Sequence, residues 1–594
     1  MLERKDVAEN LKWKLTDVFE SDEAWEAAYQ AAEKEYAACD FDKFKGKLHD
    51  KQSLLACFAL NDEVSRKLER LYLYAHMRHD EDLRIAKYTS AYAKMGALIS
   101  QVFAKFAYVE PELTTLDEAT LQAFIQDPDF AAYEYKLRKI AASKAHVLSE
   151  GEERLLALSG DVMRDFQSVF GMLNNANLNL PKATFQGEEV QMSHGLYGVV
   201  LRSGTAEERK EWFKKYYQSY INLIDAISQT YASNVKKDVF YKTVRNYERC
   251  MAMAMDGEDV PPIVYENLVK AVHAALPLMH EYVSVRKQVL GVEEQHVYDL
   301  FIPLVENAEI KLTFEEAYQL VIDGLAPLGK DYQALLQKGK DERWIDVCEN
   351  EGKRCGAYSA GIYDVHPYVL LNYQETTNEV FTIAHEMGHA LHTYKSAETQ
   401  PYAKADYTIF LAEIASTVNE VLLLKHLYKN STDKNLKKFL LNYYMEMFRA
   451  TLFRQTQFAE FEQIAHAKAE SGEALTKDLL NETYYQLNKD YYGDGIVHDE
   501  EIAYEWARIP HFYSSFYVYK YATGIISAVS IVKRILTEGE KAVADYFEFL
   551  SSGGCTDPIT ILKRAGVDLT SSAPFEAAMQ EFKDTLDEFK GLLD

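Results

Sequence analysis

The stretch FTIAHEMGHALHTY, residues 381–394, carries three histidines and a glutamate inside an otherwise apolar, helix-forming run. Imidazole and carboxyl groups are costly to bury on such a helix unless something pairs with them, and a metal ion is one such partner. His385 and His389 are four residues apart, so on a helix they share a face, with Cβ atoms about 5–6 Å apart. This spacing predicts that both ring nitrogens bind one zinc ion at about 2.0–2.1 Å.

The residues between the two histidines also fit a zinc helix. Glu386 points beside the expected ion, where it is placed to take a proton from a metal-activated water rather than to bind the metal. Gly388 removes a side chain at a point where another element can approach closely. Coincidence is the alternative, because the His-Glu-x-x-His pattern arises by chance in on the order of a few per hundred chains of this length. The apolar flanks favour zinc, since a zinc helix belongs to a core.

A catalytic zinc site needs three protein ligands and one open position. Glu413 is the predicted third ligand, because it lies in a second apolar segment, 406–428, where an acid needs a partner in the folded state. The interval from His389 is 413 − 389 = 24 residues, enough for a loop and a return as an antiparallel helix. His392 is the alternative, but its Cα lies roughly 10 Å along the helix from that of His385. We therefore expect His392 to contact a neighbouring carboxylate or to line the cleft.

Glu420 lies seven residues after Glu413, on roughly the same helix face. Two interpretations stay open for it. In the first it orients a ligand histidine through the ring N–H, as carboxylates beside zinc sites commonly do. In the second it forms a surface or interhelical ion pair.

Length and composition describe a large globular protein with an excess of acidic residues. The 594 residues suffice for a large core and two or more lobes, and 48% of them are hydrophobic. A formal net charge of −27 argues against nucleic acid and anionic membranes as partners, since both attract basic patches. Six well-separated cysteines without a CxxC pair indicate reduced thiols. The N-terminus has no apolar signal core, and no run reaches the roughly 18 apolar residues of a membrane span, so we expect a cytoplasmic protein.

The 3–4 spacing of apolar residues along the chain predicts a mainly α protein. Residues 179–195 interrupt this pattern and predict a short hairpin or connector. We take the interruption as the boundary between an N-terminal helical lobe, 1–190, and a catalytic region, 191–594. A second irregular region, 343–375, is expected to hold two short strands, WIDVC and YVLLNY, with the glycine-bearing loop GKRCGAYSAGIYDVHP between them.

Six blocks in order along nearly the whole chain resemble one known family. They are KWKLTDVFESDEAWE (12–26), VLGVEEQHVYDLFIPL (289–304), GKRCGAYSAGIYDVHPYVLLNY (352–373), FTIAHEMGHALH (381–392), EIASTVNE (413–420) and DEEIAYEWARIPHFYSSFYVYKYATG (499–524). The family is oligoendopeptidase F, a branch of the thimet-type zinc oligopeptidases. The resemblance implies a cytoplasmic zinc endopeptidase for short peptides, built as a two-lobed helical shell around a deep substrate channel. It matches His385, His389 and Glu413 to the zinc ligands and Glu386 to the catalytic glutamate.

The block 499–524 holds further candidate catalytic residues. Tyr517 and Tyr521 are four apart and share a helix face, and a phenol can donate a hydrogen bond to the oxyanion formed when water attacks a peptide carbonyl. His511 is placed to do the same or to hold the substrate backbone. In the thimet-type relatives a histidine followed by a tyrosine-bearing helix has this role, and here either Tyr517 or Tyr519 is the first equivalent. For most of this aromatic run, packing in a core is the alternative.

The predicted reaction is hydrolysis of internal peptide bonds in short oligopeptides, with one zinc ion per chain and with Glu386 as the base. Residues 358–373 are expected to offer backbone groups to an extended substrate, as an added strand. Two alternatives stay open. One is a zinc exopeptidase, which needs a site for a free terminus, and the other is a helical peptide-binding protein without a competent metal site.

Overall fold

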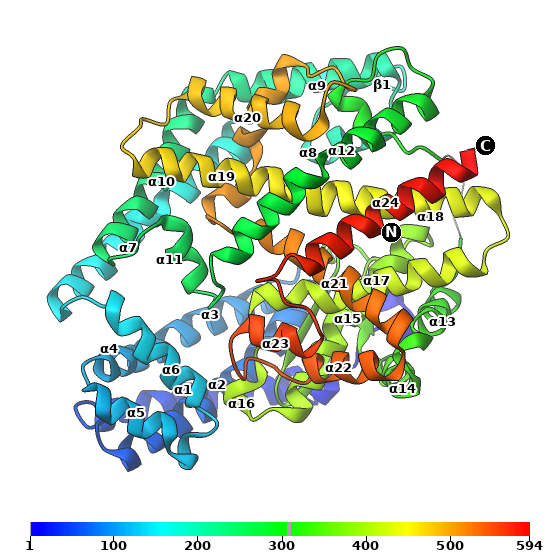
Figure 1. Cartoon of the computed structure of the whole chain (residues 1–594). Coiled ribbons are helices and arrows are strands. Elements are labelled where there is room, and N and C mark those ends of the chain that lie inside the picture. Colours follow the sequence, from blue (N-terminus) through cyan, green and yellow to red (C-terminus); the bar gives the residue numbers. More distant parts are fainter. Residues whose placement is uncertain (1, 306–310, 594) are drawn as a thin grey trace. The chain divides into compact units, whose positions relative to one another are not determined.

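The computed structural model describes residues 2–305 and 311–593, and nearly all of its regular structure is helical (Figure 1), as the apolar spacing predicts. The chain divides into two compact units, each assembled from three separate segments. Unit 1 consists of residues 1–147, 309–426 and 531–567, and unit 2 of residues 148–308, 427–530 and 568–594. The expected division into an N-terminal lobe, 1–190, and a catalytic region, 191–594, stays a prediction.

Unit 1 is built from helices around one small sheet. Its helices are α1 (Asp22–Ala38), α2 (Lys51–Glu81), α3 (Ala86–Phe106), α4 (Val109–Thr114), α5 (Glu118–Gln126), α6 (Glu134–Ser143), α13 (Phe314–Gly324), α14 (Lys330–Asp341), α15 (Thr377–Thr399), α16 (Tyr402–Ala405), most of α17 (Ile409–Asn430), α22 (Glu540–Leu550) and α23 (Pro558–Arg564). Its strands are β3 (Ile345–Asp346), β4 (Tyr358–Ile362) and β5 (Val365–Leu370).

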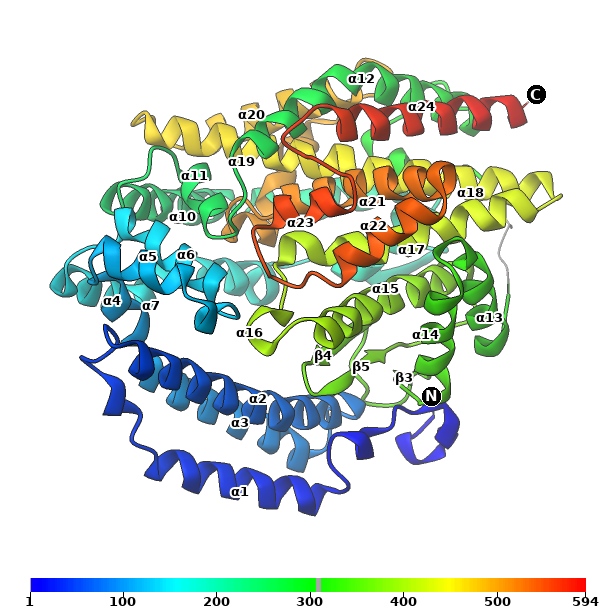
Figure 2. The same ribbon diagram turned by 60° about the horizontal axis from the view of Figure 1, so that its bottom comes forward.

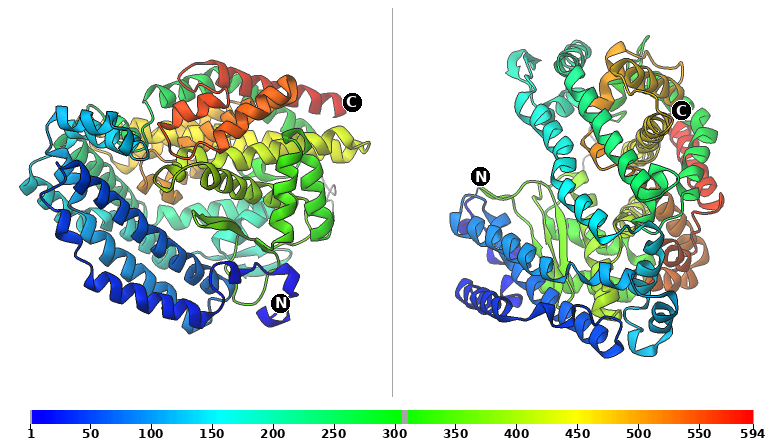
Figure 3. Two further views of the ribbon diagram at one scale, coloured as in Figure 1. Left: turned by 90° about the horizontal axis from the view of Figure 1, so that it is seen from below. Right: turned by 90° about the vertical axis from the view of Figure 1, so that its left-hand side faces the viewer.

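The N-terminal helices of unit 1 share a hydrophobic core with its sheet. Trp25 of α1 stacks on Tyr74 of α2, with ring centroids 6.4 Å apart. Figure 3 shows these first helices, in blue, side by side. Tyr368 and Leu370 of β5 are buried in the same cluster, so the N-terminal helices support the sheet from one face.

The sheet of unit 1 has the strand order β3-β5-β4, with β3 parallel and β4 antiparallel to β5. Helix α15 packs against β4 and β5 (Figure 2), and at Gly361 a side chain would collide with Thr393 of that helix. The predicted β-region next to the zinc helix is therefore confirmed. One detail of the prediction is wrong, because the segment expected as a loop contains β4 and the start of β5. As an edge strand of the sheet, β4 has one side that is not paired with β5 or β3.

Unit 2 is helical apart from one hairpin. Its helices are α7 (Glu150–Met172), α8 (His194–Ser203), α9 (Ala206–Ile221), α10 (Ile224–Val244), α11 (Cys250–Asp256), α12 (Ile263–Leu290), α18 (Lys434–Met447), α19 (Arg454–Glu470), α20 (Lys477–Tyr492), the first part of α21 (Tyr519–Glu538) and α24 (Ala573–Leu593). The hairpin predicted within 179–195 is present as β1 (Lys182–Phe185) and β2 (Glu188–Gln191). Its turn uses Gln186 and Gly187, both with positive φ, which glycine adopts at no steric cost.

Large aromatic side chains fill the core of unit 2. Tyr231 of α10 lies against Trp506 and Phe512, with ring centroids 5.8 and 5.9 Å away. Phe461 of α19 packs on the same two rings. This cluster anchors the segment that follows α20, which matters for the candidate catalytic residues described below. In neither unit is any described helix long and apolar enough to cross a membrane.

Candidate metal centre

Helix α15 carries the His-Glu-x-x-His segment and begins at an N-cap. The hydroxyl of Thr376 accepts the backbone N–H of Glu379 at 3.4 Å, which satisfies one of the free donors of the first turn. Buried residues lie on several sides of the helix, with Phe381 on one side and Ile383 and Met387 on another. It therefore forms as a core helix, as the apolar flanks predict.

Helices α15 and α17 touch backbone to backbone at Gly388. A Cβ atom on this glycine would come within 2.6 Å of the Ser416 Cα and 2.7 Å of the Ala415 carbonyl oxygen. A turn away, Asn419 donates a hydrogen bond to the Ala384 carbonyl at 3.0 Å. The pairing of 384 with 419 and 388 with 416 means that the two helices run antiparallel. The close approach expected at Gly388 is confirmed, and it brings Glu413 to the histidines.

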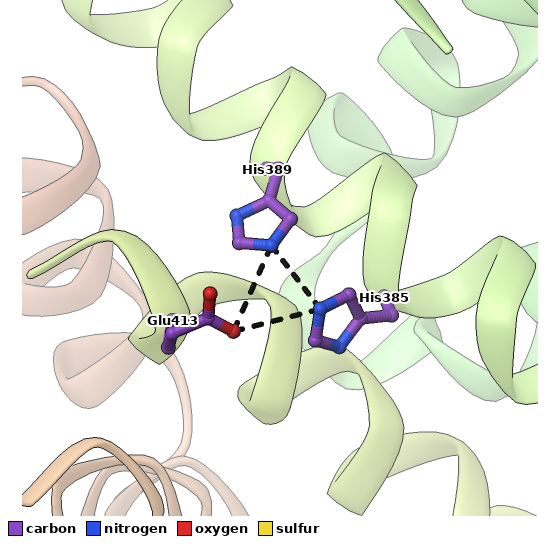
Figure 4. Close-up of side chains that lie close together, drawn as sticks. All are labelled: His385, His389 and Glu413. Carbon is purple, nitrogen blue, oxygen red and sulfur yellow. Dashed lines mark hydrogen bonds and ion pairs between the residues drawn. The ribbon is translucent and has the colours of Figure 1, made fainter. Parts of the chain in front are cut away.

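His385, His389 and Glu413 converge on one point (Figure 4). The Nε2 atoms of the two histidines are 3.1 Å apart, and the Glu413 Oε2 atom lies 3.6 Å from the first and 3.9 Å from the second. Tetrahedral ligands at about 2.0–2.1 Å from zinc lie about 3.4 Å from one another. The observed separations and the N, N, O donor set therefore fit a zinc ion. The three side chains are 28, 18 and 34% exposed, so none of them is fully buried.

Glu420 contacts the other nitrogen of His385. Its Oε1 accepts a hydrogen bond from Nδ1 at 2.6 Å, so Nε2, which faces Glu413 and His389, is the nitrogen left to bind a metal ion once it is deprotonated. Glu420 also sits on α17, so a single helix supplies both carboxylates. The geometry is that of the first interpretation of Glu420, a carboxylate that orients a ligand histidine.

The ionisable groups crowded here shift one another's pKa values. Burial alone would lower the pKa of His385, but the hydrogen bond with Glu420 and the charges of Glu386 and Glu413 raise it to about 9. Burial lowers the pKa of His389 to about 3, and the charge of His385 adds to that effect. Burial raises the pKa of Glu386 to about 7, again with help from nearby carboxylates. A divalent cation at the cluster would lower all of these values.

Glu386 and His392 lie outside the three-residue cluster, as expected. Glu386 is 7% exposed and belongs to the buried part of α15. His392 is 1% exposed and stacks on Tyr407 with ring centroids 3.8 Å apart, while Phe549 lies 5.1 Å away. Burial lowers the pKa of His392 to about 3, so its ring is neutral. His392 is thus a packed aromatic residue of the core, and among the described residues its buried Nδ1 atom has no hydrogen-bond partner. The expected contact with a carboxylate or the cleft stays a prediction.

The predicted segment 499–524 lies in unit 2 and forms two short 3₁₀ helices, η11 (Glu500–Arg508) and η12 (Pro510–Tyr513), before α21. His511, Tyr517 and Tyr521 meet as a group of three rings, with centroids 5.5–6.0 Å apart. Tyr519 is instead 1% exposed and packs on Tyr265. Of the two tyrosines left open by the sequence, Tyr517 is therefore the one grouped with His511. Burial lowers the pKa of His511, so this ring is neutral near pH 7.

Sequence reasoning did not single out the buried polar residues that hold this segment from behind. Glu462, Asp238 and His466 lie far from it along the chain and meet it only in the folded unit. A weak signal was available, since Glu462 directly follows Phe461 and lies two residues before Ile464 in the mixed polar and apolar segment QFAEFEQIA (457–465). That is the same kind of signal that pointed to Glu413.

Two histidines and a glutamate of adjacent helices around one point, with a further acid beside them, are suited to metal-assisted hydrolysis. Comparison with known families agrees. A model described as peptidase family M3 matches residues 199–581, and one described as oligopeptidase F matches residues 112–179. The chain belongs to peptidase family M3, in its oligoendopeptidase F branch, and is a metallopeptidase with peptide substrates.

Individual relatives extend over the whole chain. Oligopeptidase PepF of Bacillus subtilis is 43% identical over 594 residues, which is 100% of this chain and 88% of that protein. Group B oligopeptidase PepB of Streptococcus agalactiae is 38% identical, over 99% of this chain and 98% of that protein. Among solved structures, a putative peptidase from Chlamydophila abortus superposes with a TM-score of 0.93 at 34% identity, covering 100% of both chains. Oligoendopeptidase-F from Enterococcus faecium has a TM-score of 0.75 at 33% identity, covering 96% of this chain and 99% of that one.

Proposed function

We propose that this chain is an endopeptidase that cuts internal bonds of short peptides, with one zinc ion held by His385, His389 and Glu413. The observation that carries the proposal is the separation of 3.1–3.9 Å among the three ligand atoms, on a donor set suited to zinc. When bound there, zinc polarises the scissile carbonyl and lowers the pKa of a water molecule. The remaining steps belong to side chains of the protein.

Glu386 is proposed as the base that accepts the water proton and later passes it to the leaving amine. Its place between two ligands, on the helix turn that holds them, supports this role. Glu420 holds His385 through Nδ1, so that Nε2 points at the ligand cluster. His511, Tyr517 and Tyr521 are proposed to donate hydrogen bonds to the oxyanion that forms when water attacks the carbonyl. Their mutual packing and the family resemblance support that assignment.

The edge strand β4 is proposed to bind the backbone of an extended substrate. Its free edge offers N–H and C=O groups for one more strand, and α15 packs directly on the same sheet. Strand addition fixes the backbone direction of a peptide without demanding particular side chains.

The six cysteines are all unpaired in the structure, which suits a reducing compartment, and we propose that the enzyme works in the cytoplasm.

One experiment tests the reaction class. The purified protein is assayed for zinc by mass spectrometry and then incubated with peptides blocked at both ends. About one zinc per chain and cleavage at internal bonds are the expected results. Cleavage only after one end is unblocked would make the enzyme an exopeptidase, and zinc-free protein that binds peptides without cutting them would make it a peptide-binding protein.

A further inference from the structure

The turn that joins η12 to α21 contains a strained backbone. Phe516 has φ +58°, in the left-handed region, which is strained for a bulky residue. Its ring is buried against Tyr265 and His466, with ring centroids 5.9 and 4.5 Å away. Strain of this kind persists only where the surrounding contacts over-determine the conformation. The contacts around this turn must therefore hold Phe516 in this conformation.

Glu462 of α19 supplies the contact at the strained residue itself. Its side chain is completely buried, and its Oε1 atom accepts the N–H of Phe516 at 3.0 Å. Its Oε2 atom is buried without a hydrogen-bond partner in the described part of the chain. Burial raises the pKa of Glu462 well above its usual range, and the charge of Asp238 adds to the rise. Burial therefore favours the uncharged form of Glu462, because an ionised carboxylate is costly to bury.

A second set of contacts holds the residues that precede Phe516 in the turn. Asp238 of α10 accepts the hydroxyl of Ser515 at 2.6 Å, and its Oδ2 lies 3.3 Å from Nε2 of His466. Asn234, one turn earlier on α10, donates to the carbonyl of Phe512 at 3.3 Å. Polar side chains from two different helices thus bind one short stretch of backbone, residues 512–516.

The side chains at both ends of this stretch are those assigned to the oxyanion. His511 directly precedes it, Tyr517 directly follows it, and the two rings lie 6.0 Å apart. The path of residues 512–516 therefore decides where these two rings stand. A core that served stability alone would favour apolar residues behind the turn, because replacing buried polar groups by well-packed apolar ones is often neutral or stabilising.

We propose that Glu462 and Asp238 are positioning residues: they hold residues 512–516 so that the rings on either side stay aligned for catalysis. The inference rests on the proposed function in one respect, namely that His511, Tyr517 and Tyr521 act on the substrate. Glu462 and Asp238 touch no reacting atom.

The first test compares two variants of Glu462. Glu462→Gln keeps an acceptor for the Phe516 N–H and is uncharged like the protonated acid, so its kcat is expected within about twofold of wild type. Glu462→Leu has a similar volume without an acceptor. Its kcat is expected to fall about 10–100-fold, since small misplacements of catalytic groups have effects of that order. KM is expected to change less than about threefold, and the zinc content not at all.

The second test addresses Asp238 through Ser515, a half-buried residue whose hydroxyl group donates a hydrogen bond to Asp238. Ser515→Ala removes the hydroxyl bound by Asp238, and the neighbouring Ser514→Ala, at an exposed position, is the matched control. Ser515→Ala is expected to lower kcat about three- to tenfold with the melting temperature unchanged, while Ser514→Ala leaves both unchanged. If the two serine variants have the same kcat, Asp238 has no positioning role.

A double-mutant cycle separates positioning from simple loss of stability. Tyr517→Phe is made in the wild-type chain and in Glu462→Leu. The loss in kcat for the pair is expected to be clearly smaller than the product of the single losses, because both changes disable the same ring. A kcat loss in the double variant equal to the product of the two single losses would overturn the inference for Glu462. So would a Glu462→Leu variant that melts at lower temperature but has wild-type kcat when folded.

Failure of the proposed function has a different signature in the same data. Tyr517→Phe, Tyr521→Phe and His511→Ala, each made in the otherwise unchanged chain, would then all keep wild-type kcat. In that case the rings have no part in the reaction, whatever Glu462→Leu does. Loss of activity in the ring variants with no effect of Glu462→Leu contradicts only the positioning inference.

Discussion

Gly388 and Ser416 lie so close that a single Cβ atom on the glycine would stand 2.6 Å from the serine Cα. This contact is made by two backbones, so neither side can yield by rotating a side chain. It sets the distance between α15 and α17 at the level of the ligand cluster, and α17 carries Glu413. The geometry of the candidate metal cluster therefore depends on a residue that is not one of its three members.

Substitution of Gly388 should lower both the stability of the fold and the affinity for zinc. Gly388→Ala is expected to cost about 1–3 kcal/mol of unfolding free energy, because overpacking forces α17 away. Zinc affinity should fall about tenfold or more, since Glu413 moves with its helix. Gly96→Ala in α3 is the control, because a Cβ there meets nothing within 4 Å and alanine favours a helix. Unchanged zinc affinity in Gly388→Ala would show that the contact does not position the ligand.

The third ligand is tested by comparing two candidates. Glu413→Gln should weaken zinc binding severely, and His385→Ala or His389→Ala should abolish it, as measured by metal content after dialysis. His392→Ala should keep its zinc, because this ring packs on Tyr407 rather than joining the cluster. The His392→Ala variant is expected to have a lower melting temperature instead. If Glu413→Gln keeps its full zinc content and His392→Ala loses zinc, then His392 and not Glu413 is the third ligand.

Glu386 is tested by removing its basicity alone. Glu386→Gln should keep zinc content and peptide affinity but lose about 10²–10⁴-fold in kcat, because an amide cannot accept the proton. Stopped-flow or steady-state cleavage of a quenched fluorescent peptide gives the rate, and inhibitor titration gives the affinity. A near-wild-type rate would remove Glu386 from the mechanism.

Substrate length is predicted from the resemblance to enzymes with an enclosed channel. Blocked peptides on the order of ten residues should be cut, while folded proteins stay intact, because a folded backbone loop cannot thread a channel. The measurement uses a size series of peptides and one denatured, alkylated protein. Rapid cleavage of the long denatured chain at many sites would show an open cleft instead.

Acid should remove the stabilising effect of one buried ion cluster in unit 2. Burial alone would raise the pKa of Glu505, but ion pairs with Arg454 and Arg508, each 2.7 Å away, and the hydroxyl of Tyr484 lower it to about 2. Because this folded-state value is below the ordinary 4.5, the stabilisation is complete above about pH 4.5 and is lost as the pH falls toward 2.

Glu505→Gln should therefore lower the melting temperature most at neutral pH, by an amount that corresponds to roughly 3–5 kcal/mol. The difference from wild type should shrink below about pH 4.5. Glu500→Gln, an exposed glutamate of the same short helix η11, is the control and should change little. A difference for Glu505→Gln that stays constant from pH 7 to pH 3 would contradict the assigned pKa.

Local patterns in the sequence were enough to predict the mainly α fold class and the pairing of His385 with His389 in the candidate site. The four-residue spacing of His385 and His389 fixes a shared helix face wherever that helix packs, because the helix repeat is a local property. The hairpin at 182–191 was likewise predictable from a short turn signal. Strand β4 was missed, because its pairing with β5 lies within a segment whose glycines and polar residues indicate a loop.

Tertiary structure decided which distant residues meet these local patterns. Glu413 was predictable as a candidate ligand because an acid in an apolar helix needs a partner, whereas its 3.6 Å approach to His385 depends on the packing at Gly388. The choice of Tyr517 over Tyr519 depends on which ring the core of unit 2 buries. Glu462 reaches Phe516 across 54 residues of sequence. Contacts of that kind come from side-chain packing between separate helices, which no local periodicity records.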